Sequence, residues 1–306
     1  MAKIAVAVER AVARRARDGA PGSTSPRPLA RGEGWSVSDV LCTYGPHDRP
    51  LPEEHALVNI AVVAAGTFQY RSRSGSAFMT PGSILLGVPG QGFACGHEHG
   101  SGDRCVLFQF DPQVFEEFAG VRFEALRLPP LRSLAGVTAR ACAGVTTREC
   151  DRGYREDART AEPWEELALL LAARVLEATP GEGPATLEPL PSDAARVTRV
   201  VRRIETSLEG DLSLGALAAE ARLSRFHFLR TFERLTGLTP HQCVRRARLR
   251  EAATRLATEA TPLPEVAYDS GFGDLATFHH AFRSEFGMPP RRYRLADAAR
   301  SAGAGR

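Results

Sequence analysis

The chain has 306 residues, of which 43% are hydrophobic and 25% are charged, and its formal net charge is +3. These values are ordinary for a globular protein of two domains, and six scattered cysteines are too few for a disulfide scaffold. No apolar run approaches the length of a membrane span and no secretory signal is evident, so we expect no membrane partner, a cytoplasmic location and free thiols.

The first 178 residues are expected to form an extension and a β-rich domain. Residues 1–29 begin with an Arg-bearing, helix-like stretch and continue into Gly, Ser and Pro, which predicts a mobile extension. In the domain of residues 30–178, β-branched runs separated by Gly and Pro turns predict a small β-barrel over 30–111. Helices are expected beyond the barrel at 111–119, 131–155 and 163–178, the last with a broad apolar face.

A cluster of Cys and His residues lies near the end of the predicted barrel. Cys95, His97 and His99 alternate along an expected strand, so their side chains would share one face. Residues 100–103 have the composition of a turn that would return Cys105 beside them. Two thiolates and two imidazoles are a tetrahedral donor set for zinc or another thiophilic metal ion.

Other interpretations of this cluster stay open. His47 or His55 would alternatively complete a metal site. A structural interpretation makes the cysteines buried thiols beside surface histidines at a hairpin end. A disulfide between Cys95 and Cys105 is a third possibility, and it requires their Cα atoms to lie within about 7 Å of each other.

Residues 179–193 are rich in Pro, Gly and acidic residues without periodicity, which is typical of an interdomain linker. The next domain, residues 194–295, contains helix-turn-helix patterns at 212–237 and 263–287, ahead of a tail at 296–306. Each pattern has a short apolar helix, a tight break and a longer helix. Any pair of short helices resembles one such pattern, but two in tandem joined by a basic helix are far more specific.

In the first unit, Leu214, Leu217 and Ala218 recur at helical spacing and are expected to face a core. Ser224 is the expected N-cap of the longer helix, because its hydroxyl can accept an otherwise unpaired backbone N–H. The inward stripe predicted for that helix consists of Phe228, Phe232 and Leu235.

The second unit repeats this arrangement. Gly271 and Gly273 mark the break, and Asp274 is the expected N-cap. The inward stripe predicted for its longer helix consists of Phe278, Phe282 and Phe286.

A helix whose N-terminal half enters the major groove needs side chains that reach base edges there. Arg230 suits guanine O6 and N7, and His279 and His280 can donate to a base acceptor or a phosphate. Apolar contact with a thymine methyl suits Leu229, Leu275 and Thr277. The alternative is that these residues form the solvated faces of ordinary helices.

Residues 239–257 predict the joining helix, with Pro240 in its first turn and arginines crowded at one end: Arg245, Arg246, Arg248 and Arg250. From Asp193 onward the chain has 19 arginines against 13 acidic residues, whereas the preceding part has 20 basic against 23 acidic residues. Contact with phosphates requires a basic surface of this kind.

Two stretches, LAAEARLSRFHFLRTFERLTGLTPHQCVRRARLREAATRLA at 217–257 and VAYDSGFGDLATFHHAFRSEFGMPPRRYR at 266–294, resemble the DNA-binding domain of the AraC/XylS family of bacterial transcription regulators. The AYxSGF, FxxAFRxEFG and PxxYR elements of the second stretch are the most specific. The resemblance implies two helix-turn-helix units that flank a linker helix and read successive major grooves. PGSILLGVPGQGFACGHEH resembles the cupin-like sensor barrel found ahead of many such domains, without a complete metal-binding cupin signature.

The family resemblance also implies which residues contact DNA. The positions it implies for base reading are Phe226, Leu229, Arg230, Leu275, Ala276, Thr277, His279 and His280. In addition, Arg234 is expected to contact DNA, and Ser224, Arg245 and Arg246 are expected at phosphates. Leu229 stands where the family usually has a polar residue, so the first recognition helix is expected to read shape or a methyl group there. His280 stands where the family usually has Arg, and Leu275 and Ala276 are poor hydrogen-bonding partners, so we expect the second recognition helix to contribute affinity and register more than specificity. The helix at 163–178 corresponds to a position used for dimerisation in the family, or else packs against the barrel.

The sequence therefore predicts a multidomain protein of α and β structure, with an N-terminal cupin-like β-barrel plus helices and a C-terminal all-α domain containing two helix-turn-helix units. The expected function is a regulator, not an enzyme, that binds double-stranded promoter DNA and RNA polymerase as a homodimer. It is expected to respond to a small-molecule effector or to a metal or thiol signal, the metal being zinc or another thiophilic ion. The alternatives are a cupin-type metalloenzyme fused to a DNA-binding module, for which no carboxylate base is evident near Cys95, and a Cys95/Cys105 redox switch.

Overall fold

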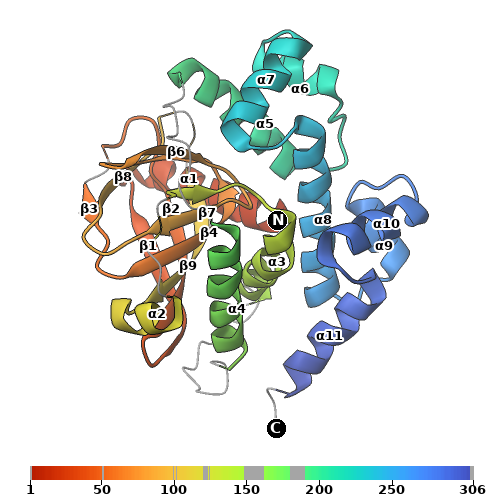
Figure 1. Ribbon diagram of the computed structural model, residues 1–306. Coiled ribbons are helices and arrows are strands. Elements are labelled where there is room, and N and C mark those ends of the chain that lie inside the picture. Colours follow the sequence, from red (N-terminus) through yellow and green to blue (C-terminus); the bar gives the residue numbers. More distant parts are fainter. Residues whose placement is uncertain are drawn as a thin grey trace.

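The computed structural model describes residues 2–49, 52–98, 100, 102–119, 123, 125–147, 162–179 and 190–303. A β-rich body with four helices lies on one side, and helices α5 to α11 lie on the other (Figure 1). None of the helices in these ranges combines the length and apolar character needed to cross a membrane.

The strands of the β-rich body form two antiparallel sheets. The six-stranded sheet has the order β1–β2–β9–β4–β7–β10, and the four-stranded sheet has the order β3–β8–β5–β6. The strands are β1 (Thr24–Gly32), β2 (Trp35–Cys42), β3 (Glu53–Glu54), β4 (Val58–Gly66), β5 (Phe68–Ser72), β6 (Gly75–Met79), β7 (Ile84–Gly87), β8 (Gly92–Gly96), β9 (Asp103–Phe110) and β10 (Arg127–Leu128). The predicted strand region is confirmed. The described strands do not form the predicted closed barrel, because no ladder of hydrogen bonds joins the two sheets. The cupin likeness remains a prediction.

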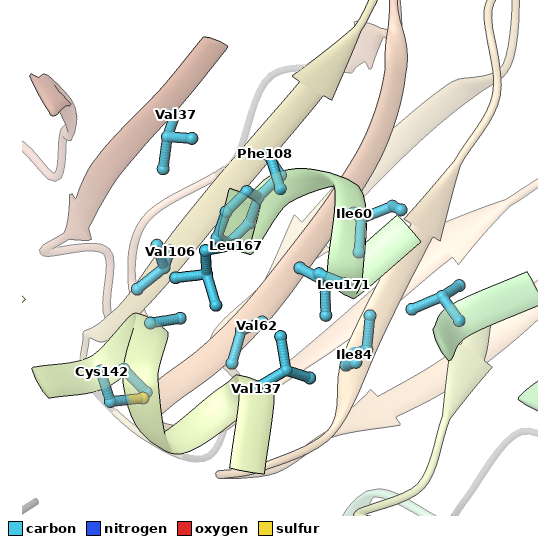
Figure 2. Close-up of a cluster of buried hydrophobic side chains, with 14 of the residues drawn as sticks. Val37, Ile60, Val62, Ile84, Val106, Phe108, Val137, Cys142, Leu167 and Leu171 are labelled. Carbon is cyan, nitrogen blue, oxygen red and sulfur yellow. The ribbon is translucent and has the colours of Figure 1, made fainter. Parts of the chain in front are cut away.

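Strand β4 shows how the six-stranded sheet is buried on both faces. Ile60 and Val62 point to a core that includes helices α3 (Arg132–Thr147) and α4 (Glu162–Ala178), as Figure 2 shows. Ala61 and Val63, the alternate residues, belong to a second apolar cluster with residues of the four-stranded sheet. Burial of both faces explains why this strand is a continuous apolar run instead of an alternating one.

The N-terminal segment differs from the predicted mobile extension. Residues Ala2–Asp18 form helix α1, and Ile4 and Val8 are buried against β4 and β9. Residues 24–29 belong to β1, which pairs with β2 along its length. The physical reason is an amphipathic pattern within the Arg-rich stretch, whose apolar side covers the sheet while the arginines stay at the surface.

The helices predicted beyond the strands are present as α2 (Pro112–Ala119), α3 and α4. The end of the segment predicted at 131–155 lies outside the described residues. The buried side chains of α4 join the core beneath the six-stranded sheet, and they are Trp164, Leu167, Ala168, Leu171, Ala172 and Val175. This arrangement fits packing of α4 against the sheet, and dimerisation stays a prediction.

The second body is entirely helical. Its helices are α5 (Pro191–Thr206), α6 (Leu214–Ala221), α7 (Arg225–Thr236), α8 (Pro240–Thr258), α9 (Leu263–Asp269), α10 (Leu275–Phe286) and α11 (Pro290–Gly303). Helix α8 runs between the α6–α7 pair and the α9–α10 pair, and α3 of the first body packs against it (Figure 1). Most of the predicted linker lies outside the described residues, and its last three residues already belong to α5.

Candidate nucleic-acid interface

Helix α7 begins and packs as the sequence predicts. Ser224 is its N-cap, and the Ser224 hydroxyl accepts the backbone N–H of His227 at 3.3 Å. The predicted inward stripe of Phe228, Phe232 and Leu235 is buried in a core shared with α5 and α6. The expectation for Leu214 was wrong: it is the first residue of α6 and 39% exposed, while Leu217 and Ala218 are buried.

Helix α10 repeats the arrangement in the second unit. The Asp274 carboxylate accepts the backbone N–H of Thr277 at 2.7 Å, and this hydrogen bond lowers the pKa of Asp274. Gly271 adopts a φ of 86°, which side-chain-bearing residues rarely reach, so the tight break depends on it. The predicted aromatic stripe is buried, consisting of Phe278, Phe282 and Phe286.

A groove of about 880 Å³ lies between the two helix-turn-helix units. Leu229 of α7 lines one side, and Thr277 and His280 of α10 line the other. Arg245 and Arg248 of α8 lie along it. The fold therefore places residues from both predicted recognition helices and two arginines of the linker helix on one concave surface.

The remaining predicted base-reading residues fall into two groups. Phe226 is 70% exposed, and the Arg230 guanidinium lies 5.7 Å from the centre of its ring, so the two project together from α7. Ala276 is also exposed. Leu275 and His279 are only half-buried at the surface, because Leu275 packs against the core and the His279 ring meets Phe278 edge-on.

Two predicted DNA-contacting arginines have intramolecular partners. Arg234 forms an ion pair with Asp193 of α5 at 2.7 Å and remains 56% exposed. Arg246 forms an ion pair with Glu285 at 3.1 Å and donates to the carbonyl of Pro130 in the first body. In this arrangement the Arg246 guanidinium joins parts of the protein instead of facing the groove, so the structure does not agree with a phosphate contact there.

Arg248 belongs to the basic run expected to contact phosphates, but it was not among the individually predicted contacts. It donates to the carbonyl of Leu208 at 3.0 Å and lines the groove. The helical spacing of α8 offered the signal: Arg245 and Arg248 are three residues apart and share a face, whereas Arg246 points elsewhere.

The Cys and His residues are arranged differently from the predicted set. Ligand atoms of Cys42, His97 and Asp103 lie within 4.8 Å of one another, and all three residues are buried. Cys105 joins through a hydrogen bond from its thiol to Asp103 Oδ1 at 3.3 Å. Cys42 and Asp103 escaped the sequence prediction because strand pairing, not spacing, brings them together: they are opposite each other in β2 and β9.

The other members of that prediction have separate surroundings. Cys95 lies on β8 in the four-stranded sheet, opposite Tyr70, and Cys95 and Cys105 are both free thiols. His55 interacts with the Tyr70 hydroxyl at 2.8 Å, and burial lowers its pKa to about 4. His47 is exposed. His99 lies outside the described residues.

The comparisons with known proteins converge on the C-terminal region. A family described as a helix-turn-helix domain matches residues 217–296. The multiple antibiotic resistance protein MarA of Escherichia coli is 30% identical over 104 residues, which are 34% of this chain and 82% of MarA. The probable transcriptional regulator LumQ of Photobacterium leiognathi is 38% identical over 92 residues, 30% of this chain and 37% of LumQ.

Among solved structures, the DNA-binding domain of AdpA in complex with a target DNA is 34% identical, with a TM-score of 0.33, over 34% of this chain and 95% of that chain. The chain thus matches little more than a third of LumQ but most of MarA. Both recognition helices are capped, a linker helix lies between them, and the match covers most of MarA. The chain therefore belongs to the AraC/XylS family of DNA-binding transcription regulators.

Proposed function

We propose that this protein regulates transcription by binding a specific promoter sequence with α7 and α10 in successive major grooves. The observation that supports this most directly is the groove between the units, which carries Leu229, Thr277 and His280 beside Arg245 and Arg248. A DNA backbone crossing between two major grooves presents phosphates to α8, where guanidinium groups can bind them.

Arg230 is the proposed source of sequence discrimination. It is exposed on α7, and no ion pair holds it among the described residues. Arg–guanine contacts discriminate by about 1–3 kcal/mol through paired donors. Among the exposed residues of α10, Ala276 and Thr277 offer methyl groups and one hydroxyl, and His280 offers a ring nitrogen to a base or a phosphate, so this helix contributes register and affinity.

The experiment that tests this function begins by selecting preferred sequences from random DNA with the full chain. Fluorescence anisotropy then compares the selected site with unrelated DNA at several salt concentrations. Arg230→Ala is expected to reduce the affinity ratio between the two DNAs about 10-fold, within the 1–3 kcal/mol of a base contact. An unchanged ratio would remove Arg230 from base readout.

Arg245→Ala is expected to weaken binding to both DNAs equally and to lower the slope of log affinity against log salt by about 1, as loss of one phosphate contact requires. Arg174→Ala on α4 is the matched control, since Arg174 is exposed, distant in sequence from the groove and paired with Glu177. If the control lowers the salt slope as much as Arg245→Ala does, the groove is not the phosphate-binding surface.

We also propose that the β-rich body modulates DNA binding as a sensor. Arg127 of β10 donates to the carbonyls of Leu235 and Thr236 at the end of α7, at 3.3 and 2.6 Å. Phe78 of β6 packs in the core of the first helix-turn-helix unit. These contacts supply a physical route by which a change in the sheets alters the population of DNA-binding arrangements. A small-molecule effector, a homodimer and contact with RNA polymerase belong to the same proposal, and we assign the protein no catalytic role.

A further inference from the structure

A buried group of three metal-ligating side chains bridges the two sheets. Cys42 ends β2, Asp103 begins β9, and the two residues are opposite each other in the ladder of the six-stranded sheet. His97 follows β8 of the four-stranded sheet. All three are buried, with 6%, 5% and 4% of their surfaces exposed, respectively.

The three ligand atoms converge on one point, where His97 and Asp103 are hydrogen-bonded directly to each other, so an ion shared by all three separates this pair to about 3.3 Å. His97 Nε2 lies 2.6 Å from Asp103 Oδ2 and 3.7 Å from Cys42 Sγ. The His97 ring is stacked with Tyr44 and with Phe68, at centroid distances of 6.4 and 5.9 Å, which holds Nε2 toward the other two groups. Imidazole, thiolate and carboxylate are the three ligand types that zinc takes in proteins.

The same geometry argues against a nucleophilic thiol. In a catalytic relay the two ring nitrogens of the histidine contact different partners. Here Nε2 faces both Cys42 and Asp103, and Nδ1 is buried without a hydrogen-bond partner among the described residues.

We propose that Cys42, His97 and Asp103 bind a thiophilic divalent cation of the zinc class. Binding releases the Cys42 thiol proton to solvent, and one thiolate and one carboxylate then balance the charge of the ion, so that the buried site is neutral. Cys105 acts beside it as a positioning residue, since its thiol donates to Asp103 Oδ1 at 3.3 Å and orients the carboxylate.

The site is connected to the DNA-binding body through its immediate neighbours. Gly66 is opposite Asp103 in the β4–β9 ladder, and its backbone N–H donates to Glu205 of α5 at 3.3 Å. Gly100, between His97 and Asp103 in the chain, lies so close to α5 that a Cβ there would be 2.9 Å from the Thr198 methyl.

Helix α5 is itself part of the first helix-turn-helix core, where Val197, Val200 and Ile204 pack with Phe228 and Phe232 of α7. Drawing His97 and Asp103 onto one ion therefore shifts the backbone that contacts the scaffold of a recognition helix. We infer that occupancy of the site changes DNA affinity, and this second half of the proposal rests on the proposed function.

The test of the site uses the full chain, freed of metal with a chelator and titrated with Co²⁺ in the absence of DNA. One equivalent is expected to produce thiolate-to-cobalt charge-transfer absorption, which Zn²⁺ then removes by competition. Cys42→Ser is expected to abolish that absorption, and Asp103→Asn, an isosteric change, is expected to weaken Co²⁺ affinity at least about 10-fold.

Two further variants make the assignment specific. Cys142→Ser is the matched control, because Cys142 is equally buried but lies in the core between the six-stranded sheet and helices α3 and α4, and it is expected to leave the spectrum unchanged. Cys105→Ser retains a donor to Asp103 and is also expected to keep the charge-transfer band. Absence of a band in the wild-type chain, or a band that survives Cys42→Ser in a protein with an unchanged circular dichroism spectrum, overturns the site.

The coupling is tested separately, by measuring the affinity of the wild-type chain for its selected DNA with and without Zn²⁺. A change of about 5-fold or more is expected, within the usual range for coupled sites, and Cys42→Ser should abolish it. Thr198→Ala removes the Thr67–Thr198 hydrogen bond of 2.9 Å and is expected to reduce the change while Co²⁺ affinity stays the same. Metal binding with an unaltered DNA affinity overturns the coupling alone, and failure to bind any DNA overturns the proposed function.

Discussion

Single side chains divide sharply between those that hold the helix-turn-helix units together and those that face outward from them. Phe282 is fully buried, and its ring centre lies 4.4 to 5.5 Å from the rings of Phe278, Phe286 and Tyr293. Phe226 is 70% exposed on α7. The same residue type therefore serves the core in one position and lies on the solvent-facing side of α7 in the other.

Phe282→Ala is expected to destabilise the second helix-turn-helix unit by about 3–5 kcal/mol, because it removes buried aromatic surface and leaves a cavity among three other rings. Urea denaturation followed by circular dichroism measures this loss. Phe226→Ala is the control and is expected to change stability by no more than about 0.5 kcal/mol. A loss below about 1 kcal/mol in the Phe282 variant would contradict the packing described for α10.

At the scale of elements, the linker helix α8 depends on a reciprocal cap at its N-terminus. The Thr239 hydroxyl accepts the backbone N–H of Gln242 at 3.3 Å, and the Gln242 side chain accepts the backbone N–H of Thr239 at 3.0 Å. Pro240 at the first helical position has no N–H to satisfy. This end of α8 carries Arg245 and borders the groove, so the cap also positions the proposed phosphate contacts.

Thr239→Ala is expected to lower stability by about 1 kcal/mol, the usual loss for an N-cap, and to weaken DNA binding in parallel by loosening the first turns of α8. Thermal melting and anisotropy measure the two effects. Thr239→Ser preserves the cap and should behave as the wild-type chain does. Equal losses in both variants would show that the methyl group, not the hydroxyl, is what α8 requires.

For the whole molecule, the contact between the two bodies contains a buried carboxyl group. Glu205 of α5 is 6% exposed and accepts the N–H of Gly66, and desolvation raises its pKa to about 8. Because the folded-state pKa lies above the ordinary value of 4.5, the folded protein holds a proton that the unfolded chain has lost between these pH values. The contribution of Glu205 to the free energy of unfolding therefore decreases as the pH rises from 4.5 to 8.

Glu205→Gln is expected to remove that dependence, so that melting temperatures at pH 6.5 and pH 8 lie closer together in the variant than in the wild-type chain. The difference across this interval corresponds to at most about 2 kcal/mol. The measurements do not go below pH 6.5 because His55 also titrates there. Burial lowers the pKa of His55 from 6.5 to about 4, so the unfolded chain takes up a proton at His55 before the folded protein does, and stability falls as the pH drops below 6.5. Identical pH slopes in the two proteins would show that Glu205 is already ionised in the contact.

The elements of the DNA-binding half were largely determined by the sequence on its own. Caps at Ser224 and Asp274 and aromatic residues at intervals of four act within one or two turns of helix, so local spacing is enough to predict both recognition helices. The helix-like character of the N-terminal stretch was also visible in the sequence, but the prediction that the segment is mobile was wrong: no residue near Ile4 in the chain indicates that this helix packs on β4 and β9.

Only the tertiary structure decided which polar groups meet. Arg246 and Arg248 are two residues apart in one basic run, yet one pairs with Glu285 and the other lines the groove. Cys42 and Asp103 are 61 positions apart and become neighbours through the register of two strands. Helix caps and apolar stripes depend on neighbours along the chain, whereas strand pairing and ion pairs depend on contacts distant in sequence, and for this reason the sequence determined the recognition helices and the fold determined the buried site.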